Sequence, residues 1–254
     1  MAKILFDCSY GVSGDMIVGA LLDLGADKEM LQSQLKSLKL GDYRLKITKL
    51  DSATDFDVLL ATDNHDHDMQ YLYGNKEANM KLEEPRTLSK VAGILENSSL
   101  SQKAKSLAME IFEVVAESEG KAHGIDKNEV IFHERGAMDS IIDIASIAIC
   151  IDNLNIDKCF VSNLREGYGK IRTRVGYLPI PTPAVKNVVD RFGAVLERIE
   201  LPYELITPTG ISALAVLTNF KNIDLEEDKI IKIGYGRGKR NYETPCTLKI
   251  ILFK

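Results

Sequence analysis

The chain has 254 residues, of which 45% are hydrophobic and 27% charged, a composition typical of soluble globular proteins and not of disordered or fibrous ones. Its 32 Lys and Arg are outnumbered by 37 Asp and Glu, and it contains no Trp, which excludes a generically basic or base-stacking nucleic-acid binder. No apolar stretch approaches the ~18–20 residues of a membrane span, and no signal-peptide core is visible near the N-terminus. We therefore expect a cytoplasmic protein that binds neither nucleic acid nor membrane.

Strand-like and helix-like segments alternate along the chain. Apolar periodicity predicts the following elements in order: a strand at 3–8, helices at 14–24 and 28–38, a strand at 43–50, helices at 87–96 and 103–123, a strand at 129–133, a helix at 139–154, a strand at 159–162, helices after the proline-rich runs PIPTP and TPTG, and strands at 229–235 and 246–253. Ser13 and Gly25 flank the first helix as its N-cap and C-cap. The order predicts an α/β or mixed α+β fold with one main domain over 1–254.

Two composition features qualify this picture. Residues 51–85 are polar and show little periodicity, and we expect a long mobile loop there. The cysteines are Cys8, Cys150, Cys159 and Cys246, and none of them forms a CxxC pair. We expect all of them to be free thiols in a reducing compartment.

The segment FHERGAMDSIIDIASIAICIDNL combines an apolar helix with a single polar stripe at spacings of 4, 3 and 4. The stripe consists of Asp139, Asp143, Ser146 and Cys150. A buried carboxylate requires a hydrogen-bond donor, a cation or a metal, and His133 just upstream is a candidate metal ligand. Three structural alternatives remain open: Asp139 as an N-cap, Asp143 paired with a buried Arg, and His133 as an ordinary core histidine.

The segment FDCSYGVSGDM places a turn between a strand and a helix N-terminus, where Ser13, Gly14 and Asp15 lie. Such a junction favours anion binding. Because Asp15 would repel a bare phosphate, a hydroxyl-bearing ligand or a bridging metal fits better, and Asp7 at the strand end is a candidate metal ligand. A simply capped helix is the alternative interpretation.

Two further turns are candidate phosphate sites. Thr207, Thr209 and Gly210 precede an apolar helix, where plain capping is the alternative. Arg237 lies in the glycine-rich and basic run GYGRGKR, which either holds a phosphate or carboxylate or forms a solvated turn.

His65 and His67 alternate with aspartates within 63–68. Imidazole and carboxylate groups on one loop can bind a divalent ion, and solvated polarity is the alternative. The sequence therefore places candidate metal ligands in three separate segments.

Five motifs occur in an order that resembles a known family. They are DCSYGVSGDMIVGALLDLG, FHERGAMDSIIDIASIAICIDNL, LPIPTPAV, TPTGISALA and GYGRGKRNYETPCTLKIIL. Together they resemble the N-terminal region of the LarC-type nickel-insertion proteins over nearly the whole chain. The resemblance implies a nickel chelatase or cyclometallase of the lyase class. It would insert nickel into pyridinium-3,5-bisthiocarboxylic acid mononucleotide and so make the nickel-pincer nucleotide cofactor of lactate racemase.

The resemblance also implies cofactors and partners. Nickel is the inserted metal, and CTP is consumed with Mg or Mn in a further C-terminal domain, which we expect to be a separate partner of this chain. The precursor mononucleotide, lactate racemase maturation proteins and a second copy of the chain are the other expected partners. Formation of a carbon–nickel bond releases a ring proton, which requires a general base, and Glu134, Asp139 and Asp143 are the candidates for this base or for metal ligands.

Two other functions remain open at this stage. One is a non-catalytic metal- or nucleotide-binding module that docks on another protein. The other is an unrelated metal-dependent enzyme acting on phosphate esters, which would hydrolyse a generic ester with added magnesium or manganese.

Overall fold

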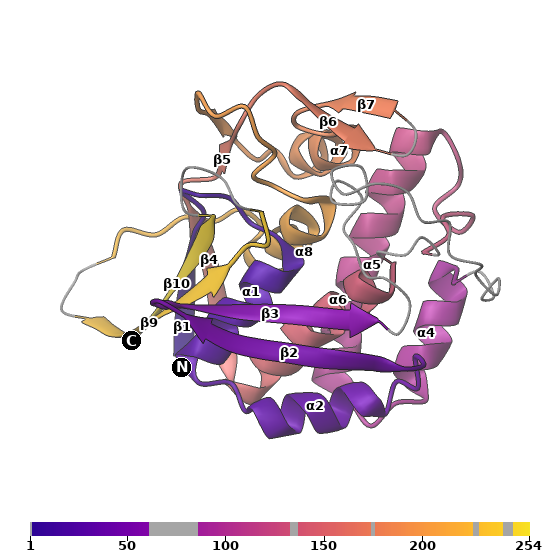
Figure 1. The fold of residues 1–254 in the computed structure, drawn as a ribbon, viewed down its shortest axis with the longest axis vertical. Helices are drawn as coiled ribbons and strands as arrows, with labels where there is room; N and C mark the ends of the chain where they lie inside the picture. The colour runs from indigo at the N-terminus through magenta and orange to yellow at the C-terminus, as the bar shows by residue number, and fades with distance from the viewer. Residues whose placement is uncertain (1, 61–85, 133–136, 174–175, 226–228, 241–245) are drawn as a thin grey trace.

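The computed structural model describes residues 2–60, 86–132, 137–173, 176–225, 229–240 and 246–254. Within these ranges a six-stranded mixed sheet is combined with seven interleaved helices (Figure 1). The helices are α1 (Gly14–Leu24), α2 (Lys28–Lys36), α4 (Leu88–Glu96), α5 (Gln102–His123), α6 (Ala137–Asn153), α7 (Pro183–Phe192) and α8 (Pro208–Thr218). The predicted mixed α/β class is confirmed.

The main sheet has the strand order β2-β3-β9-β10-β1-β4. Its strands are β1 (Ala2–Asp7), β2 (Tyr43–Leu50), β3 (Ala53–Leu60), β4 (Ile156–Ser162), β9 (Ile230–Arg237) and β10 (Thr247–Phe253). β1 pairs in parallel with β4 and antiparallel with β10, so the first and last strands of the chain are neighbours. β3 joins β9 through the single residue pair Thr54 and Gly236, while β2 and β3 form a full antiparallel hairpin.

Helix α1 lies directly on the sheet, and glycines make this close approach possible. A Cβ atom added to Gly236 would lie 1.8 Å from the carbonyl oxygen of Met16, and one added to Gly234 would lie 2.4 Å from that of Ala20. Both distances are far below any real contact, so β9 must carry glycine on the face that meets α1. The glycine-rich run that we considered as a turn is therefore mainly a strand built to accept a helix.

Behind α1 the helices form a further layer, in which α6 packs on both α1 and α5. The side chains of α6 facing this layer are almost entirely apolar and buried, as its sequence predicts. The other face of the sheet carries a small apolar cluster of Leu5, Ile251 and Phe253. The polar positions of α6 are therefore exceptions within the main core.

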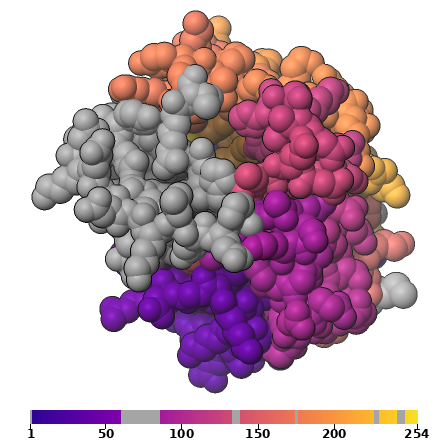
Figure 2. Space-filling model, turned by 90° about the vertical axis from the view of Figure 1, so that its right-hand side faces the viewer, coloured from indigo at the N-terminus to yellow at the C-terminus, as the bar shows by residue number. Residues whose placement is uncertain are grey.

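Smaller elements cover one end of the molecule. β5 (Arg165–Glu166) pairs with β8 (Glu197–Arg198), and β6 (Lys170–Thr173) pairs with β7 (Gly176–Pro179). Helix α7 packs against α5 and α8. Figure 2 shows this arrangement from the side, with the orange segment that contains β6, β7 and α7 above the magenta surface of α4 and α5.

The structure corrects two predicted elements. Residues 53–60, which we assigned to the long polar loop, form β3, because the alternation of polar and apolar residues there fits a strand with one buried face. The predicted strand at 129–133 is wrong for its described residues, where Ile131 makes only an isolated bridge to Thr87. Residues 61–85, the rest of the predicted loop, lie outside the described ranges.

One expectation from composition is confirmed. All four cysteines are free thiols, and burial raises the pKa of Cys150 to about 12. None of the described helices combines the length and the apolarity needed to cross a bilayer.

Candidate functional site

The first turn of α1 is positioned by the segment that precedes α8. Val12 N–H donates to the carbonyl of Leu205 at 2.9 Å, and Thr207 N–H donates to the carbonyl of Val12 at 3.0 Å. Gly210 fits against this junction, since an added Cβ would lie 2.5 Å from the carbonyl oxygen of Val12. The two helices therefore begin next to one another, and their N-terminal backbone dipoles act on the same region.

Asp15 lies in this first turn and is held by its neighbours. Its Oδ1 accepts hydrogen bonds from the hydroxyl of Ser13 and, at 2.9 Å, from the N–H of Met16. Ser13 occupies the predicted N-cap position, but its side chain makes no capping bond to the helix. Its hydroxyl orients the Asp15 carboxylate instead.

Asp143 reaches the same turn from α6. A Cβ added to Gly14 would lie 2.5 Å from Asp143 Oδ2, so the absence of a side chain at Gly14 is what admits the carboxylate. Burial, together with the negative charges of Asp15 and Asp139, raises the pKa of Asp143 well above its usual range, and the charge of Lys239 only partly opposes this. Asp143 is therefore a carboxyl group prepared to hold a proton.

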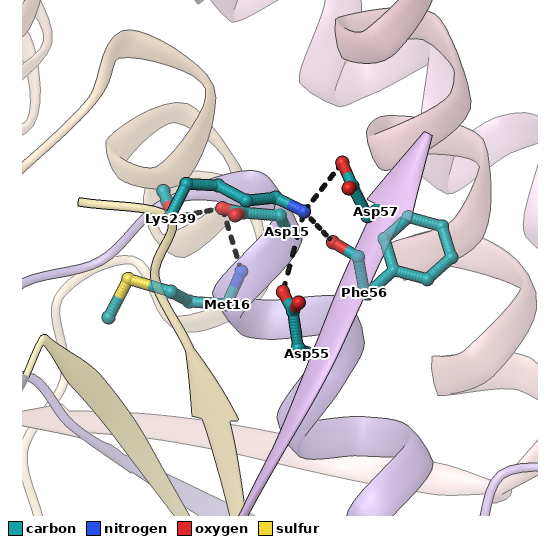
Figure 3. Close-up of polar contacts among 7 residues, drawn as sticks. Asp15, Met16, Asp55, Phe56, Asp57 and Lys239 are labelled. Atoms are coloured by element: carbon teal, nitrogen blue, oxygen red, sulfur yellow. Dashed lines mark hydrogen bonds and ion pairs between the residues drawn. The ribbon is translucent and has the colours of Figure 1, made fainter. Parts of the chain in front are cut away.

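Lys239 supplies a positive charge to this site from the turn after β9 (Figure 3). Its Nζ lies 2.7 Å from Asp57 Oδ1 and 3.4 Å from Asp55 Oδ1, and it donates to the carbonyl of Phe56 at 2.7 Å. Burial disfavours the charged form, but the charges of Asp15, Asp57 and Asp55 outweigh burial and raise the pKa of Lys239 above its ordinary value. The ammonium group therefore stays protonated among carboxylates.

We call Asp15, Asp55, Asp57, Asp139 and Asp143 the acidic cluster. Its members come from α1, β3 and α6, which are far apart in the chain. A sulfur pair adjoins it: Cys246 Sγ lies 3.9 Å from Met16 Sδ. Burial and the nearby charge of Asp15 raise the pKa of the Cys246 thiol to about 11, so it is protonated at neutral pH.

The structure brings most of the predicted residues on helices together. Asp139, Asp143, Ser13, Gly14 and Asp15 meet at the start of α1. Asp139 lies in the first turn of α6, which begins at Ala137, so the N-cap alternative for it is wrong.

The predicted residues of α8 lie close by, with Thr207 and Gly210 next to the start of α1. Thr207 caps α8 by accepting a hydrogen bond from Gly210 N–H at 3.2 Å. Thr209 lies in the first turn of the same helix. Capping thus explains Thr207, and a role in binding phosphate stays a prediction.

Other predicted residues lie elsewhere. Arg237 projects from the face of β9 opposite to Gly236, toward Asp51 at 4.0 Å. Asp7 is engaged at the end of β1, where hydrogen bonds from Ser9 and Asn163 outweigh burial and lower its pKa. Four candidates lie outside the described residues: His65, His67, His133 and Glu134.

Sequence reasoning missed Asp55, Asp57 and Lys239 as site residues. The alternation in TDFDVLL places both aspartates on one face of a strand, on either side of the buried Phe56. The sequence contains this pattern, but the predicted polar loop over 51–85 included these residues.

Within the described ranges, no three His, Cys, Asp or Glu side chains are arranged to hold a metal ion. The acidic cluster itself has two properties, a concentration of negative charge around Lys239 and a raised proton affinity at Asp143. A groove of about 350 Å³ between α4 and α5 and one of about 270 Å³ between α5 and α7 are not lined by any residue of the cluster.

Replacement of Lys239 by Met should destabilise the protein. Removing one partner of a buried ion pair costs ~3–5 kcal/mol, but a third of the Lys239 side chain is exposed, and solvent screening reduces the expected loss to about 2 kcal/mol. A raised lysine pKa stabilises the fold below the ordinary lysine pKa, and this contribution is lost as the pH rises through the folded value.

Urea unfolding at pH 7, where the raised lysine pKa contributes in full, measures this effect. Lys186→Met is the matched control, because Lys186 forms a surface ion pair with Asp190 on α7 and should contribute at most ~0.5 kcal/mol. Equal losses in the two variants would contradict the role given to Lys239.

The fold and the site define a mixed α/β protein with a cluster of acidic side chains around the start of its first helix. The chain belongs to the nickel insertion protein family, whose model matches residues 4–254. The resemblance seen in the sequence motifs is therefore confirmed.

Three relatives are called pyridinium-3,5-bisthiocarboxylic acid mononucleotide nickel insertion proteins. That of Alkaliphilus metalliredigens is 41% identical over 94% of this chain and 57% of its own length. Those of Clostridium acetobutylicum and Geobacillus kaustophilus are 38% and 36% identical, over 99% and 98% of this chain and 64% and 59% of their own lengths. The chain thus spans about 60% of these relatives, and no solved structure matches it.

Proposed function

We propose that this chain carries the nickel-inserting site of a cyclometallase that acts on pyridinium-3,5-bisthiocarboxylic acid mononucleotide. Membership of the nickel insertion family and the names of the relatives support the substrate. The observation that carries the proposal is the acidic cluster, in which a proton-accepting Asp143 lies against the first turn of α1.

The chemistry of the substrates fits such a site. Nickel ions and the pyridinium ring are both positively charged, and a group of carboxylates raises the local concentration of cations. Formation of the nickel–carbon bond breaks a ring carbon–hydrogen bond and releases a proton. Asp143 in its ionised form accepts this proton, and its raised pKa makes it a stronger base than an ordinary aspartate.

The remaining residues have proposed roles in binding. Nickel accepts imidazole and carboxylate ligands, and the proposed ligands are His65, His67, His133, Asp7 and Glu134. The converging starts of α1 and α8 favour the phosphate of the mononucleotide. The proposed contacts there are Ser13, Gly14, Thr207, Thr209 and Gly210, with Arg237 as a further candidate for an anionic group.

The proposal includes partners. CTP, with Mg or Mn, is bound by a CTP-binding C-terminal domain like that of the family, and that domain acts with this chain. Lactate racemase maturation proteins and a second copy of the chain are further proposed partners, and the proposed location is the cytoplasm.

A spectrophotometric insertion assay tests the function. The purified chain is mixed with the precursor mononucleotide, nickel and CTP, with and without a separately made C-terminal domain of a relative. We expect nickelated product only when the domain is added. Product from the chain alone would contradict the proposed need for a C-terminal partner domain. No product in either mixture, beside an active full-length relative, would favour a non-catalytic binding module.

A further inference from the structure

Arg240 forms a largely buried ion pair beside the acidic cluster. Its Nη2 lies 2.9 Å from Glu204 Oε2, and the two side chains are only 21% and 5% exposed. Its Nη1 also donates to the carbonyl oxygen of Glu204 at 3.3 Å. Two contacts to one residue fix the orientation of a planar guanidinium group. Because buried ion pairs contribute little net stability, a role in positioning is the better explanation for this one.

The segment that Arg240 contacts is itself firmly attached. Glu166, a fully buried residue of β5, accepts hydrogen bonds from the N–H groups of Gly167 and Leu205 through one oxygen, both at 2.8 Å. Leu205 also bonds to Val12, two residues before α1. The pair thus connects Arg240 to the backbone that sets the position of Asp15.

Lys239, the residue before Arg240, is held from a different side. Gly238 N–H donates to the carbonyl of Cys246 at 2.8 Å and closes the ladder between β9 and β10. Beyond this point Lys239 reaches β3, while Arg240 reaches the segment before α8. The side chains of Lys239 and Arg240 therefore attach the same turn to two separate parts of the fold.

We propose that Arg240 and Glu204 are positioning residues whose ion pair keeps the Lys239 ammonium among Asp15, Asp55 and Asp57. The importance of the Lys239 position for nickel insertion rests on the proposed function. The contacts that hold Lys239 in that position do not depend on it. By holding the ammonium in place, the pair sets the charge of the acidic cluster and opposes a further rise in the proton affinity of Asp143.

Trace labelling of lysine amines with acetic anhydride between pH 7 and pH 11, read by mass spectrometry, tests the proposal. It reports the pKa and accessibility of each lysine and needs no nickel, nucleotide or CTP. In Glu204→Gln and in the conservative variant Arg240→Lys, we expect the Lys239 pKa to fall by about half a unit. This corresponds to about a threefold rise in its labelling at pH 8.

One internal standard, Lys49, and one control variant, Glu197→Gln, make the result decisive. Lys49, which pairs with Asp23 on α1, is read in the same samples and should not change. Glu197→Gln removes the exposed pair of Glu197 with Arg165 at 2.8 Å and should leave Lys239 unchanged. A threefold rise confined to Lys239 in either variant of the pair supports the proposal.

Unchanged Lys239 labelling in both variants, or a rise that Lys49 shares in both, would overturn it. A failure of the nickel-insertion assay would instead remove the proposed function and leave the labelling result intact, so the two failures are distinguishable.

Discussion

Asp143→Asn should abolish nickel insertion while raising the melting temperature of the protein. Loss of a general base reduces the rate by ~10²–10⁴-fold, and Asn cannot accept the ring proton. The same change removes an unfavourable charge, because burial and the neighbouring Asp15 and Asp139 disfavour ionised Asp143. The insertion assay and thermal unfolding of the same preparation measure both effects.

The pH dependence has a definite sign. A carboxyl group whose pKa is raised on folding makes the folded state less stable as the pH rises from its ordinary value through its folded value. The gain in melting temperature should therefore be largest at neutral pH and should vanish below about pH 4, where aspartate is protonated in both states.

Asp190→Asn is the matched control for this variant. It makes the same change in charge at an exposed ion pair on α7 and should alter neither activity nor melting temperature. Retained insertion activity in Asp143→Asn would contradict the general-base role. A lowered melting temperature would instead show that the carboxylate is stabilised by its surroundings.

Gly236→Ala should lower the free energy of unfolding by more than about 3 kcal/mol, the upper range for overpacked cores. The new Cβ would lie 1.8 Å from the carbonyl oxygen of Met16 and 2.7 Å from the N atom of Ala20. Both are backbone atoms of α1, so no side-chain rotation can relieve the overlap. The helix must move off the sheet and take Asp15 with it. Urea unfolding measures the loss.

Gly93→Ala is the control for this substitution. Gly93 lies in α4, and apart from its own helix backbone and chain neighbours no heavy atom of the described residues lies within 4 Å of its added Cβ. The substitution should stabilise the protein by about 0.5–1 kcal/mol through helix propensity. If both variants lost stability equally, the cause would be a general sensitivity to added methyl groups and not the contact of β9 with α1.

Helix periodicity and capping residues predicted the elements whose sequence signals lie close together in the chain. The first helix runs over 14–24 as predicted, with Ser13 before it and Gly25 in the left-handed conformation after it, at φ 115°. Likewise the spacing of Asp139 and Asp143 placed both on one helix. Periodicity and capping depend on neighbours within a few residues, and a single sequence contains them.

The prediction failed where distant partners decide the outcome. β3 lies in the main sheet because β2 and Gly236 of β9 pair with it, and the alternation within residues 53–60 does not by itself show which distant strand would be its partner. The same failure hid Asp55 and Asp57, because their value as site residues depends on Lys239, which lies about 180 residues away.

The sequence alone determined the family, the mixed α/β class, most helices and the aspartates of α6. It did so because ordered motifs and short-range periodicity are properties of the chain itself. Only the tertiary structure decided that α1, β3, α6 and the turn after β9 meet at one acidic cluster. The pKa of Asp143 depends on charges brought together by that packing, and the spacing of residues along the chain does not reveal their distances in space.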